Sequence, residues 1–525
     1  MEIPLLLNIL KKRSPEDMVS RVKNDGLTKT LGWFDLIILG ISAVIGSGIF
    51  VMIGEAACGT SEHVGAGPSL IVSILLAGLA CVFPALCYAE FSSSIPVAGG
   101  AYTYTYASMG ELMAWMTGWI LILEYAISNI TIAASWGGYL FQLLKGFENI
   151  LPSWLVNPPL WLIHDYNTAV AKYQAMGLNP ADEIPHLFGL PVSVNVPSIF
   201  IILIIASILI RGMKESAKTA TVMVFIKLAV IFLFICVGAF YVKPSNWVPF
   251  APNGFTGIIL GAFVMFYSYL GFDALSTAAE ETKEPQKNIP IGIIGTLATA
   301  SFVYILVTLV FTGVVPASQY GSIDIHAPIA HITRMIHQDW VAGWISLGAL
   351  AGLTSVLLVL QFAASRIVYS MARDNFLPKI LRLRHPVFKT PHIIIWVLAA
   401  ILVVISQFMD MSVAAQLCIF GTLTCFTLVC AGILIMRKTH PELERPFKVP
   451  FCPWIPLAGI FVCAYLFVKT IPQLSTSALL FPVWLIMGLY IYFIYGYPKN
   501  RQIEEKENML IQRHRAKKEE NANVR

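Results

Sequence analysis

Residues 34–55 read FDLIILGISAVIGSGIFVMIGE, an apolar stretch with Gly46, Ser47 and Gly48 at its middle. As a helix this stretch is about 33 Å long at 1.5 Å per residue, enough to cross about 30 Å of hydrocarbon. Glycine and serine at mid-membrane favour local unwinding, and unwound backbone is tolerated there only where protein or a polar cavity surrounds it. The stretch therefore predicts a transmembrane helix that is interrupted at its centre. The same glycines could instead form a surface for close helix packing.

The composition of the whole chain excludes a soluble fold. The 525 residues are 57% hydrophobic and 12% charged, whereas soluble domains are about 25% charged. The apolar residues come in continuous runs of about 20, which excludes a porin-type barrel with alternating segments of about 10. The net charge is +5. In a membrane protein the positions of the basic residues along the chain matter more than the total charge, so we expect no nucleic-acid partner.

Twelve apolar runs predict an all-α polytopic membrane protein with 12 transmembrane helices. They lie at 34–55, 68–94, 102–143, 197–212, 217–241, 257–279, 289–315, 340–372, 391–409, 411–436, 452–473 and 477–496. The run 102–143 has 42 residues, which is long for one helix, and it could be divided near Ser128 and Asn129. The distribution of charge favours a single bent or tilted span instead.

Lysines and arginines set the orientation of these spans. With a single third span, 28 of the 35 basic residues fall on one side, mainly in the segments 1–33, 373–391, 437–451 and 497–525. Dividing the third run would move every later basic loop to the other side. Because basic residues gather on the cytosolic side, we expect both termini to be cytosolic. Short loops and twelve spans suit a bacterial inner cell membrane.

A second glycine-bearing stretch, FYSYLGFD at 266–273, lies in the sixth span. Two interrupted helices five spans apart are what a five-plus-five inverted repeat predicts, with the substrate bound between the two breaks. We therefore expect discontinuous helices 1 and 6 in a transporter domain at 34–496, flanked by cytosolic tails at 1–33 and 497–525. The parts of this domain are a first repeat at 34–241, a second repeat at 257–436 and two extra helices at 452–496.

The two breaks together predict a site for a zwitterion. Unwinding at Gly46, Ser47 and Gly48 exposes amides at the positive end of the following half-helix, which attracts a carboxylate. Carbonyls freed at the second break would face an ammonium group. Tyr267 could close over the ligand, and Tyr267 and Asp273 are the candidate gating residues. This pair of charges favours an α-amino acid over a sugar, which would need several amide and carboxylate side chains.

Two charged residues lie deep inside spans, Glu124 in the third and Lys227 in the fifth. Lys227 is ten residues past the start of its span, too deep to reach the membrane surface easily. Burial disfavours the ammonium form, so Lys227 is a candidate for proton exchange, with a structural ion pair as the alternative. Its ammonium could replace the sodium ion that ties the first and eighth spans together in comparable transporters. Glu124 could be a proton partner, a determinant for cationic side chains or a static counter-ion.

Motifs for catalysis, metal binding and ATP binding are absent from the sequence. It contains no HExxH, Cys-x-x-Cys, Walker A or Gly-x-Ser-x-Gly pattern. The nine cysteines lie mostly inside apolar runs and are interpreted as packing residues. We therefore expect neither an enzyme nor a cofactor or metal site. The charged residues at 280–284 are expected to form a solvated cytosolic loop, in which salt bridges could act as a gate but would contribute little if exposed.

Six stretches resemble the amino acid–polyamine–organocation (APC) superfamily of permeases, and within it the bacterial relatives of cationic amino acid transporters. They are GISAVIGSGIF (40–50), YAEFSSSIPVAGGAYTYTY (88–106), GWILILEY (118–125), YLGFDALSTAAEETKEPQKNIPIGI (269–293), SRIVYSMARDNFLP (365–378) and RPFKVPFCP (445–453). The likeness extends from Gly32 to Pro498. It implies the inverted-repeat fold and proton-coupled amino acid uptake.

The resemblance also implies roles for single residues. A lysine matching Lys227 occupies the cation site of this group, and spans three and eight help to line the pocket. Substrate contacts from the two breaks would come from Ile45, Gly46, Ser47, Gly48, Tyr267, Ser268 and Leu270, with Glu124 on span three.

Together these features predict a secondary transporter that moves an amino acid inward with a proton by alternating access. Its partners are a cationic or neutral L-amino acid, the proton and the lipid bilayer. An exchanger or facilitator, in which Lys227 stays charged and acts as a strut, is the alternative within transport. An ion channel or a nutrient receptor is the alternative from another class, although no span carries a filter signature.

Overall fold

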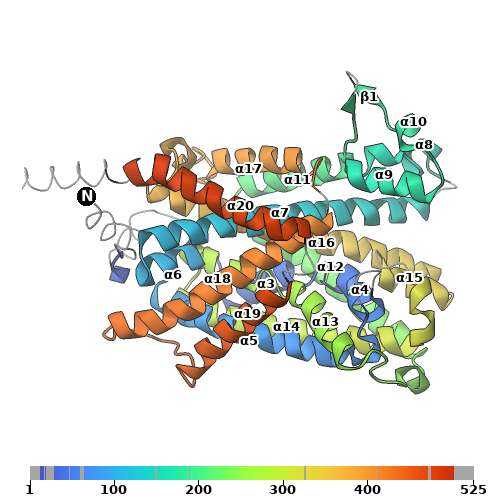
Figure 1. Cartoon of the computed structure of the whole chain (residues 1–525), viewed down its shortest axis with the longest axis horizontal. Coiled ribbons are helices and arrows are strands. Elements are labelled where there is room, and N and C mark those ends of the chain that lie inside the picture. The colour runs from blue at the N-terminus through green and yellow to red at the C-terminus, as the bar shows by residue number, and fades with distance from the viewer. Residues whose placement is uncertain are drawn as a thin grey trace, which may run out of the picture.

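The structure is a computed structural model of the chain. It describes residues 12–16, 18, 29–46, 48–59, 64–147, 150–187, 190–323, 327–409, 411–470, 475–499 and 501. These residues are almost entirely helical (Figure 1). Their one sheet is a two-residue antiparallel pair, β1 His186–Leu187 with β2 Leu190–Pro191. The all-α fold class is confirmed for the described part of the chain.

The apolar runs form helices because a helix satisfies its own backbone amides, which hydrocarbon cannot do. The longer helices are α3 Trp33–Val44, α5 Leu70–Ser94, α6 Ala101–Ser108, α7 Glu111–Lys145, α11 Val196–Ile210, α12 Met213–Ala239, α13 Gly254–Tyr267, α14 Pro285–Val314, α15 Pro328–Met335, α16 Asp339–Arg373, α17 His392–Ile405, α18 Met411–Thr439, α19 Trp454–Thr470 and α20 Ser475–Ile491. The shorter elements used below are the π-helix η1 Gly48–Met52, α4 Ile53–Cys58, α8 Ser153–Val156, α9 Tyr166–Ala175, α10 Pro180–Glu183, and the 3-10 helices η5 Phe272–Glu281 and η6 Ala317–Ser322.

Nine helical stretches among the described residues are long and apolar enough to cross a membrane, and three shorter apolar helices accompany them. Each of the twelve apolar runs overlaps one of these helices. The count of twelve crossings and the inverted repeat stay predictions.

The third run is interrupted, although the distribution of charge favoured a single span, and the interruption is not at the alternative position near Ser128 and Asn129. Helix α7 continues through Ser128 and Asn129, whose side chains bond to carbonyls four residues earlier, at 2.6 Å in both cases. The run is cut instead at Met109 and Gly110, between α6 and α7. Gly110 has φ +104°, a conformation that glycine adopts at little cost. A single long helix, α7, therefore remains.

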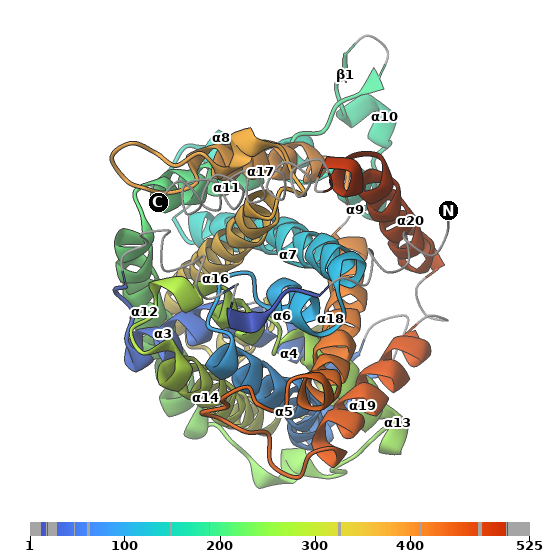
Figure 2. The same cartoon turned by 90° about the vertical axis from the view of Figure 1, so that its left-hand side faces the viewer.

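The helices run roughly side by side between two ends of the molecule (Figure 1). We call these the α6 end, where α6 lies, and the α15 end, from which α8 to α10 and the β1–β2 pair extend. Inside the bundle α3 contacts α12, α14, α16 and η5, and α7 contacts α16 and α18. At the periphery α19 packs on α18 and α5, and α20 packs on α18 and α7 (Figure 2). The interrupted elements are thus enclosed by longer helices.

Candidate functional site

Helix α3 ends partway along the first apolar run. Its last residue is Val44, and Ile45 leaves the helical conformation with φ −82° and ψ 98°. The chain becomes helical again at Gly48 as η1, which α4 continues. Ile45 and Gly46 are buried, whereas Ser47 lies outside the described residues. The predicted interruption of this helix is present.

The second interruption follows α13. This helix ends at Tyr267, and residues 268–271 form a turn before η5 begins. Gly271 has φ +104°, where a side chain would strain the backbone. The amides of residues 268–270 bond to carbonyls three residues earlier at 3.0–3.2 Å. The turn therefore closes the last carbonyls of α13 locally, and fewer carbonyls are available than the sequence suggested.

The two breaks face each other. A Cβ atom built on Gly48 would lie 2.6 Å from Cβ of Ser268 and 3.0 Å from its Cα. A Cβ atom built on Gly271 would lie 3.1 Å from Cβ of Ala43, near the end of α3. Both distances are shorter than ordinary van der Waals contact, so this approach of the two chains depends on glycine at both positions.

Lys227 of α12 caps the end of α3. Its fully buried Nζ lies 3.0 Å from the carbonyl oxygen of Ile41 and 3.2 Å from that of Ser42, and it also donates to Ile45. A fourth contact, at 3.0 Å, is Oγ of Ser355 on α16. The last carbonyls of a helix lack partners and carry partial negative charge, which an ammonium stabilises. These four acceptors are carbonyls and a hydroxyl rather than a carboxylate, unlike a structural ion pair.

Glu124 of α7 and Asp273 of η5 are two buried carboxyl groups whose charges interact, and they are called the carboxyl pair below. Glu124 is 2% exposed and Asp273 is 0% exposed, and the two repel each other when both are ionised. Tyr125 donates to Asp273, and Thr422 of α18 bonds to the Glu124 side chain. Oε2 of Glu124 and Oδ1 of Asp273 have no hydrogen-bond partner within the described structure. Two buried carboxylates are costly without a cation, so this pair is suited to carrying a proton.

The remaining predicted residues lie at the second break. Tyr267 is 7% exposed, and its hydroxyl bonds to Thr131 of α7. Ser268 is buried, and Leu270 is partly buried against the core. Tyr267 thus joins the second break to α7, and Asp273 joins η5 to the same helix.

Ion pairs join η5 to α16 at the α6 end. Arg366 of α16 pairs with Glu281 of η5, and Arg373 of α16 pairs with Glu280 at 3.0 Å. Glu280 is 4% exposed and Glu281 is 5% exposed, so the expectation of a solvated loop was wrong for these two residues. The sequence signal was a pair of glutamates soon after the second break, but their arginine partners come from a helix about 85 residues later.

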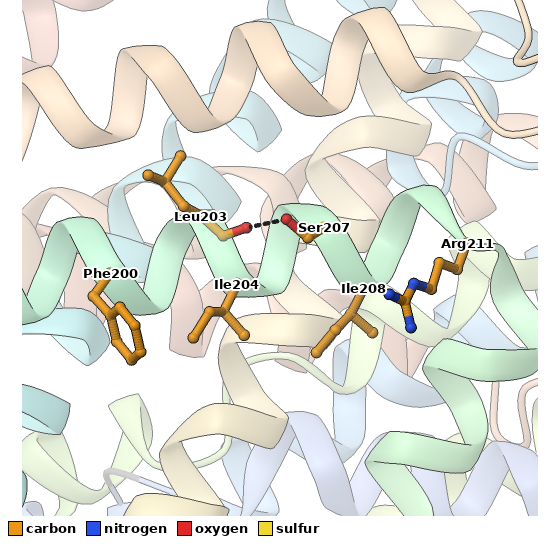
Figure 3. Close-up of a pocket in the computed structure, with 6 residues that line it drawn as sticks. All are labelled: Phe200, Leu203, Ile204, Ser207, Ile208 and Arg211. Carbon is orange, nitrogen blue, oxygen red and sulfur yellow. Dashed lines mark hydrogen bonds between the residues drawn. The ribbon is translucent and has the colours of Figure 1, made fainter.

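Two openings among the described residues have linings that include neither Gly48 nor Ser268, where the breaks meet. One is a groove along one face of α11, lined by Phe200, Leu203, Ile204, Ser207, Ile208 and Arg211 (Figure 3). The other is a narrow apolar gap lined by Phe50, Val230, Ile231, Phe234, Val307, Ile329 and Ile345. Between the breaks, the contact of Gly48 with Ser268 leaves the chains closely packed. Gly48 and Ser268 themselves leave no room for a ligand between them.

Residues 31–493 match a family model described as amino acid permease. The chain belongs to the amino acid permease family. The match includes both breaks, Lys227 and the carboxyl pair. Together with the apolar helices, it makes this permease a multi-pass membrane protein.

Three relatives show how close the likeness is. The chain is 41% identical to the methylthioribose transporter of Bacillus subtilis (strain 168), over 93% of this permease and 98% of the relative. It is 39% identical to the branched-chain amino acid permease BcaP of the same organism, with the same coverage. It is also 39% identical to the chloroplastic cationic amino acid transporter 9 of Arabidopsis thaliana, over 71% of this permease and 60% of the relative. The family and these relatives are permeases and transporters, not enzymes.

Proposed function

We propose that this permease is a secondary active transporter that takes up a cationic or neutral L-amino acid together with a proton. The observation that carries the proposal is the meeting of two interrupted helices, with Gly48 of the first against Ser268 of the second. Opposed breaks of this kind supply both helix ends and free peptide groups to one small ligand. Relatives named as amino acid permeases support the same substrate class.

The substrate carboxylate binds at the first break, at Ile45, Gly46, Ser47 and Gly48. The chain there begins the helical segment η1–α4, and amides at a helix N-terminus attract anions. The ammonium group binds at the second break, where Ser268 is the first residue after α13. Leu270 and Glu124 line the part of the site that receives the substrate side chain.

The proton is carried by Lys227 and Glu124. Lys227 bonds to the end of α3 from α12 and also contacts α16, so its protonation controls how firmly three helices are joined. Glu124 repels Asp273 when both are ionised, so its protonation controls the contact of α7 with η5. Inward movement of substrate is coupled to the proton through these two contacts.

Two gates alternate in closing the site. Tyr267 covers the substrate from the end of α13, and Asp273 holds η5 against α7 through Tyr125. The ion pairs of Arg366 and Arg373 with η5 close the α6 end. Opening toward the α6 end therefore requires η5 to leave both α7 and α16.

The transporter domain, 34–496, crosses the inner cell membrane twelve times, with both termini in the cytosol. Its two repeats, 34–241 and 257–436, are related by inversion, and 452–496 adds two helices. Under this arrangement the α6 end faces the cytosol and the α15 end faces outward. The positive-inside distribution of lysine and arginine supports this orientation.

The proposal is tested first by ligand binding to the purified protein. A thermal-shift screen of the twenty amino acids and of methylthioribose reports affinity, because a ligand that binds the folded state raises the melting temperature. We expect stabilisation by one group of amino acids. Stabilisation by methylthioribose alone would contradict an amino acid substrate. The substrate would then be the one named for the 41%-identical relative.

Flux then separates the alternatives. Protein in liposomes with an inward proton gradient is expected to accumulate the stabilising amino acid. Exchange of labelled for unlabelled substrate without accumulation would instead identify an exchanger or facilitator. Binding without flux would identify a receptor, and ion current without substrate would identify a channel.

A further inference from the structure

The hydroxyl of Tyr304 on α14 lies between the two breaks. Its oxygen is 2.9 Å from the carbonyl oxygen of Val44, the last residue of α3, and 2.6 Å from that of Ser268, which follows α13. The side chain is fully buried, and its ring packs edge-to-face against Tyr269 with 5.3 Å between centroids. A third helix thus contacts both interrupted helices through one side chain.

Both carbonyls belong to negative helix ends. The last carbonyls of a helix lack intrahelical partners, and together they act as roughly half a negative charge. Two such ends repel unless a donor lies between them. A phenol has a single hydrogen to donate, so Tyr304 serves one carbonyl at a time and stays within reach of the other. Its hydroxyl lowers the cost of holding α3 and α13 close together.

Tyr304 and Lys227 bind different carbonyls of α3 with different chemistry. Lys227 takes those of Ile41, Ser42 and Ile45, whereas Tyr304 takes that of Val44. An ammonium can lose its proton in response to pH, whereas a phenol stays neutral and protonated near pH 7. The Lys227 contact is therefore sensitive to protonation, and the Tyr304 contact is constant.

We propose that Tyr304 is a positioning residue for substrate binding, which holds the Val44 and Ser268 carbonyls at the separation that the substrate ammonium group requires. The inference rests on the proposed function, since it assumes an amino acid bound between the breaks. Tyr304 acts through the two backbone carbonyls, so it contributes to recognition of the amine and leaves recognition of the carboxylate to the first break.

The test is Tyr304→Phe, which keeps the ring and removes the hydroxyl. Affinity is measured for the stabilising amino acid and for the carboxylic acid of the same skeleton without the amine. Losing the hydroxyl leaves buried carbonyls without a donor, so we expect amino acid affinity to fall about tenfold. Affinity for the analogue should change little, and the pH dependence of transport should stay that of the wild type.

The matched control is Tyr320→Phe, which removes the buried hydroxyl of η6 that has no hydrogen-bond partner in the described structure. It is expected to bind both ligands normally. The ratio of the two affinities refers to the same folded molecules, so it stays informative if Tyr304→Phe lowers the yield of folded protein. Equal weakening of both ligands, or no weakening of either, would overturn the inference. A wild type that binds no amino acid would instead refute the proposed function.

Discussion

Lys227 contacts three carbonyls that the first break leaves near the end of α3. A charged ammonium has three hydrogens for these oxygens, whereas a neutral amine has two. Deprotonation therefore weakens the contact between α12 and α3 without removing any atom except the proton. This difference is the physical reason for proposing that Lys227 couples transport to the proton.

Replacing this lysine separates coupling from binding. Lys227→Ala is expected to abolish proton-driven accumulation and to retain exchange, because the carbonyls lose their titratable donor while the breaks remain. Uptake and exchange in liposomes measure the two activities. Lys218→Ala, an exposed lysine on the same helix, is the control and should behave as wild type. Accumulation by Lys227→Ala would remove Lys227 from the coupling mechanism.

The carboxyl pair gives a second prediction at this scale. Glu124→Gln places a neutral amide where the protonated acid would be, so repulsion of Asp273 is lost at every pH. We expect the variant to bind substrate and exchange it, with a flattened pH dependence of net transport. Glu111→Gln is the control, since Glu111 is a buried glutamate of α7 that accepts from Tyr492 at 2.8 Å. An unchanged pH profile in Glu124→Gln would count against a proton at this pair.

The two interrupted helices depend on glycine where they approach each other. Gly48 meets Ser268 and Gly271 meets Ala43, so at each break a glycine lets the chain approach a residue of the other interrupted helix closely. Broken helices expose peptide groups that a continuous helix would hide. The contact between the elements therefore supports both the packing and the proposed binding of a charged ligand.

A methyl group at the first break should interfere with the packing of the two breaks and with substrate binding. In Gly48→Ala the new Cβ would lie 2.6 Å from Cβ of Ser268, so the breaks must shift, and substrate affinity is expected to fall at least tenfold. Gly48→Leu, which fills the proposed carboxylate site, should abolish binding. Gly138→Ala on α7 is the control, because a Cβ there meets nothing within 4 Å. Thermal-shift titration measures all three, and wild-type affinity in Gly48→Leu would refute the site.

Across the whole molecule, the amino-terminal segment is joined to the α6 end. Arg13 pairs with Asp374, which follows α16, and its guanidinium lies 4.7 Å from the ring centre of Tyr106. Tyr102 donates to the same carboxylate at 2.7 Å. Burial alone would raise the pKa of Asp374, but the charges of Arg13 and Arg373 outweigh it and hold the pKa below its ordinary value. The contact lies at the same end of the molecule as the ion pairs of η5.

The direction of that pKa shift predicts how the contact depends on pH. A carboxyl with a lowered pKa contributes stability above its unfolded pKa of about 3.9 and loses it only as the pH falls through the lower, folded value. Hydrogen exchange around Arg13, corrected for intrinsic rates, is therefore expected to be the same at about pH 6 and pH 8. Asp374→Asn should speed this exchange, and Asp182→Asn in exposed α10 should not. Release of the segment in the wild type between these pH values would contradict the assignment.

Much of the fold could be predicted because its signals are local. A run of hydrocarbon length can satisfy its amides only as a helix, so the apolar runs coincide with helices throughout the described chain. The breaks were also predictable, since Gly46, Gly48 and Gly271 stand in otherwise apolar stretches. The cut at Gly110 was missed, because one glycine among many does not reveal its own φ angle.

The amino-acid sequence alone determined the membrane class of this permease, the positions of its helices and the two points at which helices stop. Composition and glycine placement act on neighbouring residues, so they can be recognised along the chain. Only the tertiary structure decided which buried groups meet. Glu124 interacts electrostatically with a carboxyl 149 residues later, and Tyr304 reaches a carbonyl 260 residues earlier. Such contacts depend on how whole helices pack, and no local pattern encodes that packing.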